Sequence, residues 1–166
     1  MDCDRPDSAV RIRLELQSRP ESVALVRSVL RTVGRAIELD RALIDDMRTA
    51  VSEACNNVVV HAYPAAAGPL IFALAVNADT IEVVVRDHGC GMRPGCVRNH
   101  GLGMGVVVIN ALAERAEFTS DRASGTEVRM TFRRPAPIPE RLADLRLGVW
   151  TLAGPGSSDG LRVRSG

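Results

Sequence analysis

The sequence predicts an α+β fold: a two-layer sandwich in which a mixed, mainly antiparallel sheet is covered by helices on one face. Two observations lead to this fold class. Apolar residues alternate in some segments and recur at intervals of three and four in others, in the order β-α-α-β-β-loop-α-β-β. The helices come in blocks and the strands are joined by short turns, which favours antiparallel pairing.

The first part of the chain is predicted to form one strand and two helices. Residues 10–17 alternate between apolar and polar side chains, which is the period of a half-buried strand. Pro20 and Glu21 open a helix whose apolar positions are Val23, Val26, Val29, Leu30, Val33 and Ile37. Asp40 is expected to cap a second helix, which ends before Pro64 and is apolar at Leu43, Ile44, Met47, Val51, Ala54 and Val58.

The second part is predicted to contain four strands and a third helix. Residues 70–76 and 80–86 are two strands with a hairpin turn between them, and residues 116–120 and 126–133 are a final pair. Residues 87–105 are too rich in glycine for regular structure throughout, and residues 106–113 follow as a helix. The domain therefore spans residues 10–134. A tail at 1–9 precedes it, and a Pro/Gly/Ser-rich tail at 135–166 follows, in which residues 142–150 are expected to form a short helix.

Composition limits the classes of function. A chain of 166 residues with a net charge of +1 suits one globular domain and gives no sign of direct nucleic-acid or membrane binding. The polar N-terminus lacks the apolar stretch of a signal peptide, and no apolar run reaches the roughly 20 residues that span a bilayer. We therefore expect a cytoplasmic protein, whose four cysteines are free thiols.

Three polar side chains on the second helix are candidates for chemistry. Glu53, Asn57 and His61 are spaced at four residues and share one face. An amide oxygen is a suitable ligand for Mg²⁺, and a carboxylate one turn away can take the proton of a hydroxyl nucleophile. The alternative is that the three residues form the solvated face of the helix.

Two glycine-rich segments are candidates for a nucleotide site. Asp87 follows an apolar strand and precedes Gly89 and Gly91, so its carboxylate can accept the exocyclic amine of adenine; a plain turn is the alternative. Residues 100–105 lead directly into a helix, where backbone N–H groups suit phosphates. Neither a Rossmann unit nor a P-loop fits, since no βαβ unit surrounds these glycines and no G-x-x-x-x-G-K-[ST] occurs.

Taken in order, these segments and the Gly125-Thr126 pair resemble the N, G1 and G2 boxes and the closing Gly-Thr of the gyrase, histidine-kinase and mismatch-repair ATPase superfamily, the Bergerat ATP-binding fold. Residues 51–63, together with Gly103-Met104-Gly105, more narrowly resemble the small anti-sigma-factor serine/threonine kinases. The similarity covers roughly residues 10 to 133.

The resemblance implies a role for each matched position. Glu53 would be the catalytic base, and Asn57 would hold Mg²⁺. The ATP site would comprise Asn57, Asp87, Gly89, Gly91, Met92, Gly103, Met104, Gly105 and Thr126. The partners implied are a small anti-anti-sigma substrate of the STAS type and a sigma factor, with the kinase acting as a homodimer in transcription regulation.

The segment between Met92 and Gly101 is short for an ATP lid and leaves open which cation contacts the γ-phosphate. Arg93, Arg98 and His100 are the candidates, and we favour Arg98. Two other functions stay open. One is a nucleotide-binding regulatory switch that binds a partner protein without transferring phosphate to it. The other is a histidine-kinase catalytic domain, which the absence of a preceding phosphoacceptor helix disfavours.

Overall fold

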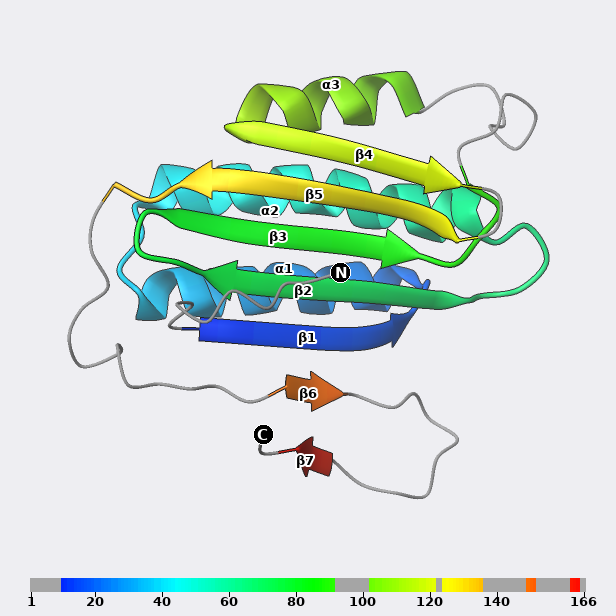
Figure 1. The fold of residues 1–166 in the computed structure, drawn as a ribbon, viewed down its shortest axis with the longest axis horizontal. Helices are drawn as coiled ribbons and strands as arrows, with labels where there is room; N and C mark the ends of the chain where they lie inside the picture. The colour runs from blue at the N-terminus through cyan, green and yellow to red at the C-terminus, as the bar shows by residue number, and fades with distance from the viewer. Residues whose placement is uncertain (1–9, 92–101, 122–123, 136–148, 152–161, 165–166) are drawn as a thin grey trace.

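The computed structural model describes residues 10–91, 102–121, 124–135, 149–151 and 162–164. It shows a five-stranded sheet with three α-helices on one face, as predicted (Figure 1). The elements of this layered unit are β1 (Val10–Gln17), α1 (Pro20–Ala36), α2 (Arg41–Asn57), the π-helix η1 (Val58–Ala62), β2 (Pro69–Val76), β3 (Thr80–Asp87), α3 (Leu102–Leu112), β4 (Arg115–Asp121) and β5 (Gly125–Arg133).

The strand order in the sheet is β1-β2-β3-β5-β4, and every neighbouring pair is antiparallel. The sheet is thus antiparallel throughout its described strands, one of the two arrangements expected. Side chains alternate between the two faces, so every second residue points toward the helices. The fully buried side chains include Phe72, Ile81, Val83, Val85, Met130 and Phe132. They pack against the apolar stripes of α1 and α2 and form the core.

The helices begin and end close to the predicted positions, with two differences. Asp40 occupies the N-cap position of α2, but its side chain makes no capping hydrogen bond. The α2 helix passes into η1 at Val58, where the hydrogen-bond pattern widens to that of a π-helix. Such wide turns are uncommon and occur frequently at functional sites.

The prediction for the start of α3 was wrong. The helix begins at Leu102 rather than at residue 106, so Gly103 and Gly105 lie in its first turn and not in the preceding loop. The low helix propensity of glycine led to the later start. The described structure places Gly105 against α2, where a larger residue meets other side chains.

The C-terminal region also differs from expectation. Strands β6 (Val149–Thr151) and β7 (Arg162–Arg164) form an antiparallel pair, and β6 lies beside β1 (Figure 1). The helix expected at residues 142–150 was wrong at its end, which is a strand, and its remainder lies outside the described residues. None of the described helices is long and apolar enough to cross a membrane.

Candidate functional site

Asp87 is the last residue of β3, and its side chain is only 3% exposed. Its Oδ1 accepts hydrogen bonds from the backbone N–H groups of Gly89, at 2.8 Å, and Thr126, at 3.2 Å. Burial raises the pKa of this carboxyl group, and the two hydrogen bonds oppose that rise. Within the described part of the chain both hydrogen bonds end on Oδ1, which leaves Oδ2 for a ligand.

Backbone segments approach Asp87 so closely that glycine is required. A Cβ on Gly125 would lie 2.2 Å from the carbonyl oxygen of Asp87, and Gly125 has a φ of +83°. A Cβ on Gly89 would lie 2.2 Å from the carbonyl oxygen of Ala62. Gly91 has a φ of +70° and lies close to the backbone of Asp121. These glycines bring η1, β3 and the β4–β5 hairpin together around one carboxylate.

Tyr63, which directly follows η1, links the end of that helix to the backbone next to Asp87. Its hydroxyl donates to the carbonyl oxygen of Pro69 at 2.6 Å and accepts from the backbone N–H of His88 at 2.8 Å. Its ring also covers Gly68, where any side chain would collide with it. Beside it, the backbone N–H of Cys90 donates to the carbonyl oxygen of Ala62 at 3.0 Å. The sequence interpretation used Tyr63 only as part of a motif and gave it no structural role.

Glu53 and Asn57 form a second cluster on the side of α2 that faces α3. A Cβ built on Gly105 lies 3.2 Å from Oε2 of Glu53 and 3.5 Å from Nδ2 of Asn57, so the first turn of α3 covers both side chains. Among the described residues neither side chain forms a hydrogen bond or ion pair, and Nδ2 of Asn57 is buried without a partner. The Glu53 carboxylate and the Asn57 amide, which have no hydrogen-bond partner among the described residues, thus lie beneath the first turn of α3.

This cluster fits a magnesium ion that is bound partly by its substrate. A flip of the Asn57 amide exchanges nitrogen and oxygen, so a hard oxygen ligand is available at the buried position. No three His, Cys, Asp or Glu side chains gather as a metal site in the described ranges. Mg²⁺ usually takes one or two protein ligands and completes its shell with phosphates and water, which this arrangement permits.

The remaining predicted site residues lie in the first turn of α3, on η1 or outside the described residues. The N–H groups of the first turn of α3 have no partners within their own helix and face an anion favourably. A Cβ on Gly103 meets no described atom within 4 Å, so steric crowding does not explain this glycine. Met104 is 74% exposed. The His61 side chain makes no hydrogen bond to any described residue. Met92, Arg93, Arg98 and His100 lie outside the described residues.

The fold is that of a class of ATPase domains. Residues 16–132 match the family model described as a histidine kinase-like ATPase domain, and the chain belongs to that family. Within it, the chain is similar to the serine-protein kinase RsbW. It is 32% identical over 79 residues to RsbW of Bacillus cereus (strain Q1), which covers 48% of this chain and 49% of that protein. It is 25% identical over 135 residues to RsbW of Bacillus mycoides (strain KBAB4), covering 73% and 83%.

Solved structures agree with this assignment. The RsbU and RsbW domains of Rv1364c from Mycobacterium tuberculosis match with a TM-score of 0.60 and 25% identity, over 78% of this chain and 34% of that one. The histidine kinase domain of the blue-light activated Erythrobacter litoralis EL346 protein matches with a TM-score of 0.50 and 18% identity, over 75% and 63%, and shows the fold alone. The predicted fold class and family resemblance are confirmed. The chain spans about half the length of the first of these RsbW relatives.

Proposed function

We propose that this protein is an ATP-dependent serine/threonine kinase of the anti-sigma-factor type, which phosphorylates a small anti-anti-sigma partner and sequesters a sigma factor. The observation that carries the proposal is the placement of Glu53 and Asn57, without partners among the described residues, under the first turn of α3. The names of the RsbW relatives support the same activity.

Each cluster has a defined task in this proposal. Oδ2 of Asp87 accepts the adenine amine, while Oδ1 accepts the hydrogen bonds from the N–H groups of Gly89 and Thr126. The first turn of α3 binds phosphate oxygens through its free N–H groups, and the Asn57 amide oxygen binds Mg²⁺. Glu53 takes the proton of the partner's serine hydroxyl as its oxygen bonds to the γ-phosphorus, and ADP leaves.

Glu53→Gln tests this assignment because it keeps the shape of the side chain and removes the base. Single-turnover phosphorylation of an anti-anti-sigma protein should slow by about 10²–10⁴, with nucleotide and partner affinity retained. Glu117→Gln, on the exposed part of β4, is the matched control and should transfer phosphate normally. A wild-type protein that binds ATP and partner but never transfers phosphate would instead establish the nucleotide-binding switch.

The proposal includes a cytoplasmic homodimer. This part of the proposal rests on the resemblance to the anti-sigma-factor kinases, because Ile71, Ala75 and Val84, which lie outside the helix-side core, are already buried within this chain. Light scattering after size exclusion measures the mass. A protein that remains a monomer at every concentration tested contradicts the dimer and leaves the kinase assignment intact.

A further inference from the structure

The exposed side of α1 carries a row of arginines. Arg27, Arg31 and Arg35 are spaced at four residues and all are exposed. None of the three forms a hydrogen bond or ion pair with any described residue. Like charges at this spacing repel one another along a helix, so the row weakens α1 rather than supporting it. Solvated helix faces usually carry charges of both signs. The acidic residue of α1 is Glu21, which lies in the first turn and not within the arginine row.

A row of small side chains runs beside the arginines. Ala24, Ser28, Thr32 and Ala36 are also exposed and also spaced at four residues. Small residues on one face let the backbone of a second helix come close. Because a helix rises about 1.5 Å per residue, the arginine row extends over about 12 Å, or roughly two turns. The shape therefore suits a helix that lies along or across α1.

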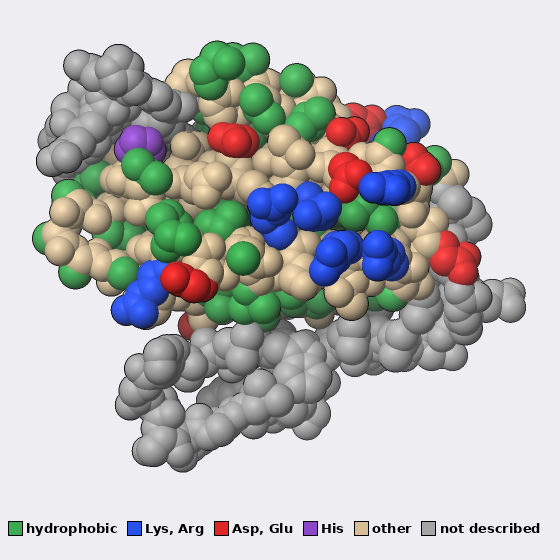
Figure 2. All heavy atoms as spheres, turned by 180° about the vertical axis from the view of Figure 1, so that it is seen from behind, with side chains coloured by type: hydrophobic (Ala, Val, Ile, Leu, Met, Phe, Trp, Pro, Cys, Tyr) green, Lys and Arg blue, Asp and Glu red, His purple; other side chains and the backbone are tan. Residues whose placement is uncertain are grey.

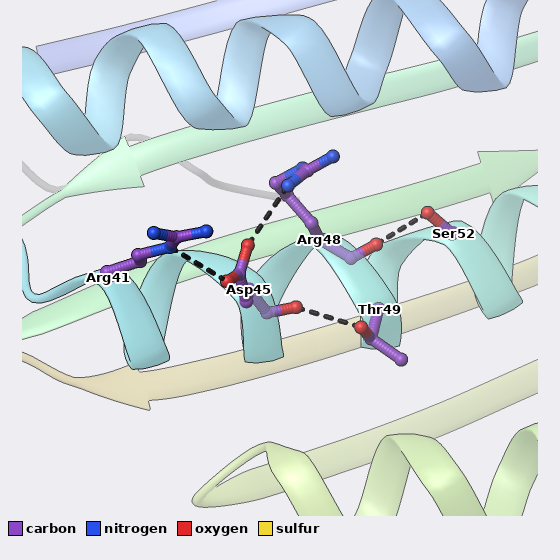
Figure 3. A network of polar contacts seen from close by, with 5 residues as sticks. All are labelled: Arg41, Asp45, Arg48, Thr49 and Ser52. Atoms are coloured by element: carbon purple, nitrogen blue, oxygen red, sulfur yellow. Dashed lines mark hydrogen bonds and ion pairs between the residues drawn. The ribbon is translucent and has the colours of Figure 1, made fainter.

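Positive charge continues from α1 onto α2. Gly34 packs against Ile44, which places the two antiparallel helices in contact. Arg48 reaches from α2 toward α1 (Figure 3), and its Nη1 donates to Oδ1 of Asp45 at 3.0 Å. Its Nε is buried without a hydrogen-bond partner. Seen from the helix side, several arginine side chains gather over the middle of this face (Figure 2).

The charge pattern favours a protein over a polyanion. Asp45 lies within the basic area, and Glu38 and Asp40 stand exposed just beyond the end of α1. These carboxylates repel a uniformly negative surface such as DNA or an anionic membrane, and the net charge of the chain is only +1. The chain contains no lysine: all 21 of its basic residues are arginines, whose planar guanidinium binds a carboxylate through two parallel hydrogen bonds.

We propose that the arginine face, comprising Arg27, Arg31, Arg35 and the adjacent small-residue row, docks an acidic α-helix of a partner protein. That helix presents carboxylates one turn apart to the arginines and its backbone to the small residues. The face lies on the α1 side of α2, opposite the side on which Glu53 meets α3, so the inference does not depend on phosphoryl transfer.

An NMR titration tests the docking face directly. The probe is a helix-forming, alanine-rich peptide with Glu at three positions spaced by four, added to the ¹⁵N-labelled full chain; the control peptide has Gln at those positions. The acidic peptide should shift the α1 amide signals and the Gln peptide should not. The triple variant R27Q/R31Q/R35Q should bind at least about fivefold more weakly. Raising the salt to about 0.3 M should weaken the wild-type complex.

The matched control is R13Q/R115Q/R133Q, which makes the same change in net charge on arginines that already pair with Glu15, Glu117 and Glu114. It should bind within about twofold of the wild type. Ser28→Trp provides a test without any charge change and should also weaken binding, by filling the small-residue row. The docking proposal is wrong if the acidic peptide leaves α1 unshifted, or if both triple variants lose binding equally. It is also wrong if a DNA duplex or phosphatidylserine vesicles bind through these arginines more tightly than the peptide.

Discussion

Replacing Asp87 tests the adenine pocket only if the replacement preserves the hydrogen bonds that assemble it. Alanine would leave the N–H groups of Gly89 and Thr126 without their acceptor, at a cost of about 1–3 kcal/mol each, or roughly 2–6 kcal/mol in total. Native domains are stable by only about 5–15 kcal/mol. Asp87→Ala would therefore confuse unfolding with loss of binding.

Asp87→Asn separates the two effects. The amide oxygen can still accept from both N–H groups, while an NH₂ group replaces Oδ2 and opposes the adenine amine, donor against donor. ATP affinity should fall by about 1–3 kcal/mol, or roughly 5- to 150-fold, while GTP, whose ring carries an acceptor at that position, should lose little. Calorimetry with both nucleotides measures this, with the exposed Asp79→Asn as control. A folded Asp87→Asn protein that binds ATP as tightly as the wild type would refute the adenine assignment.

The same substitution has a signature in pH. Burial raises the pKa of Asp87 above 3.8, so the folded state holds the proton more tightly than the unfolded state. The free energy of unfolding should then fall as pH rises from about 3.8 through the raised pKa, and become level above it. Asp87→Asn removes this titration and should flatten the slope in that window. Urea denaturation from about pH 4 to pH 8 compares the two proteins.

Three further predictions concern the framework around the site. Gly125→Ala should destabilise the fold by about 2–5 kcal/mol, because Gly125 has a φ of +83° and a Cβ there would lie 2.2 Å from the carbonyl oxygen of Asp87. Urea denaturation measures this loss, and a loss under about 1 kcal/mol would contradict the geometry. Tyr63→Phe should cost about 1–3 kcal/mol, because the backbones of β2 and of the segment after β3 lose their shared partner; a shift of the thermal midpoint checks this, and no shift would count against the bridge. Cys55 should resist alkylation at about pH 8 until the protein unfolds, because burial raises its thiol pKa to about 12; mass spectrometry after iodoacetamide treatment reports it, and fast native labelling would show that the thiol is accessible.

The sequence predicted the sheet well because residues 10–17 alternate cleanly, and because residues 70–76 and 80–86 are short apolar runs separated by a turn. Residues 10–17 were predicted and found as β1, and the other strands of the main sheet differ from the prediction by one residue at one or both ends. Strand boundaries depend on hydrogen bonds to neighbours, which alternation does not reveal. The early start of α3 was missed because glycine disfavours helices, and Gly105 is placed there by its contact with Glu53 and Asn57.

The site was predictable in its composition but not in its assembly. Asp87, Glu53 and Asn57 were recognised from residue type and motif order, and their roles stay predictions. The interaction between Asp87 and Thr126 joins residues 39 positions apart, and that between Tyr63 and His88 joins residues 25 apart. Such contacts depend on strand order and on the path of η1. The position of β5 between β3 and β4, rather than beyond β4, is a tertiary outcome that local patterns do not encode.

The late position of β5 in the chain has a consequence for how the protein is made. Residues 10–121 supply every described strand of the main sheet except β5, which pairs with β3 and brings Gly125 and Thr126 against Asp87. On a ribosome, β3 therefore keeps an open edge until residues 125–133 have emerged and inserted beside it. Under the proposed function, a nucleotide held at Asp87 would bind only the completed sheet and would stabilise it by mass action. Cellular ATP would thus bind and stabilise only chains in which β5 has inserted. Chains truncated before β5 would lack this stabilisation and would be degraded by proteases.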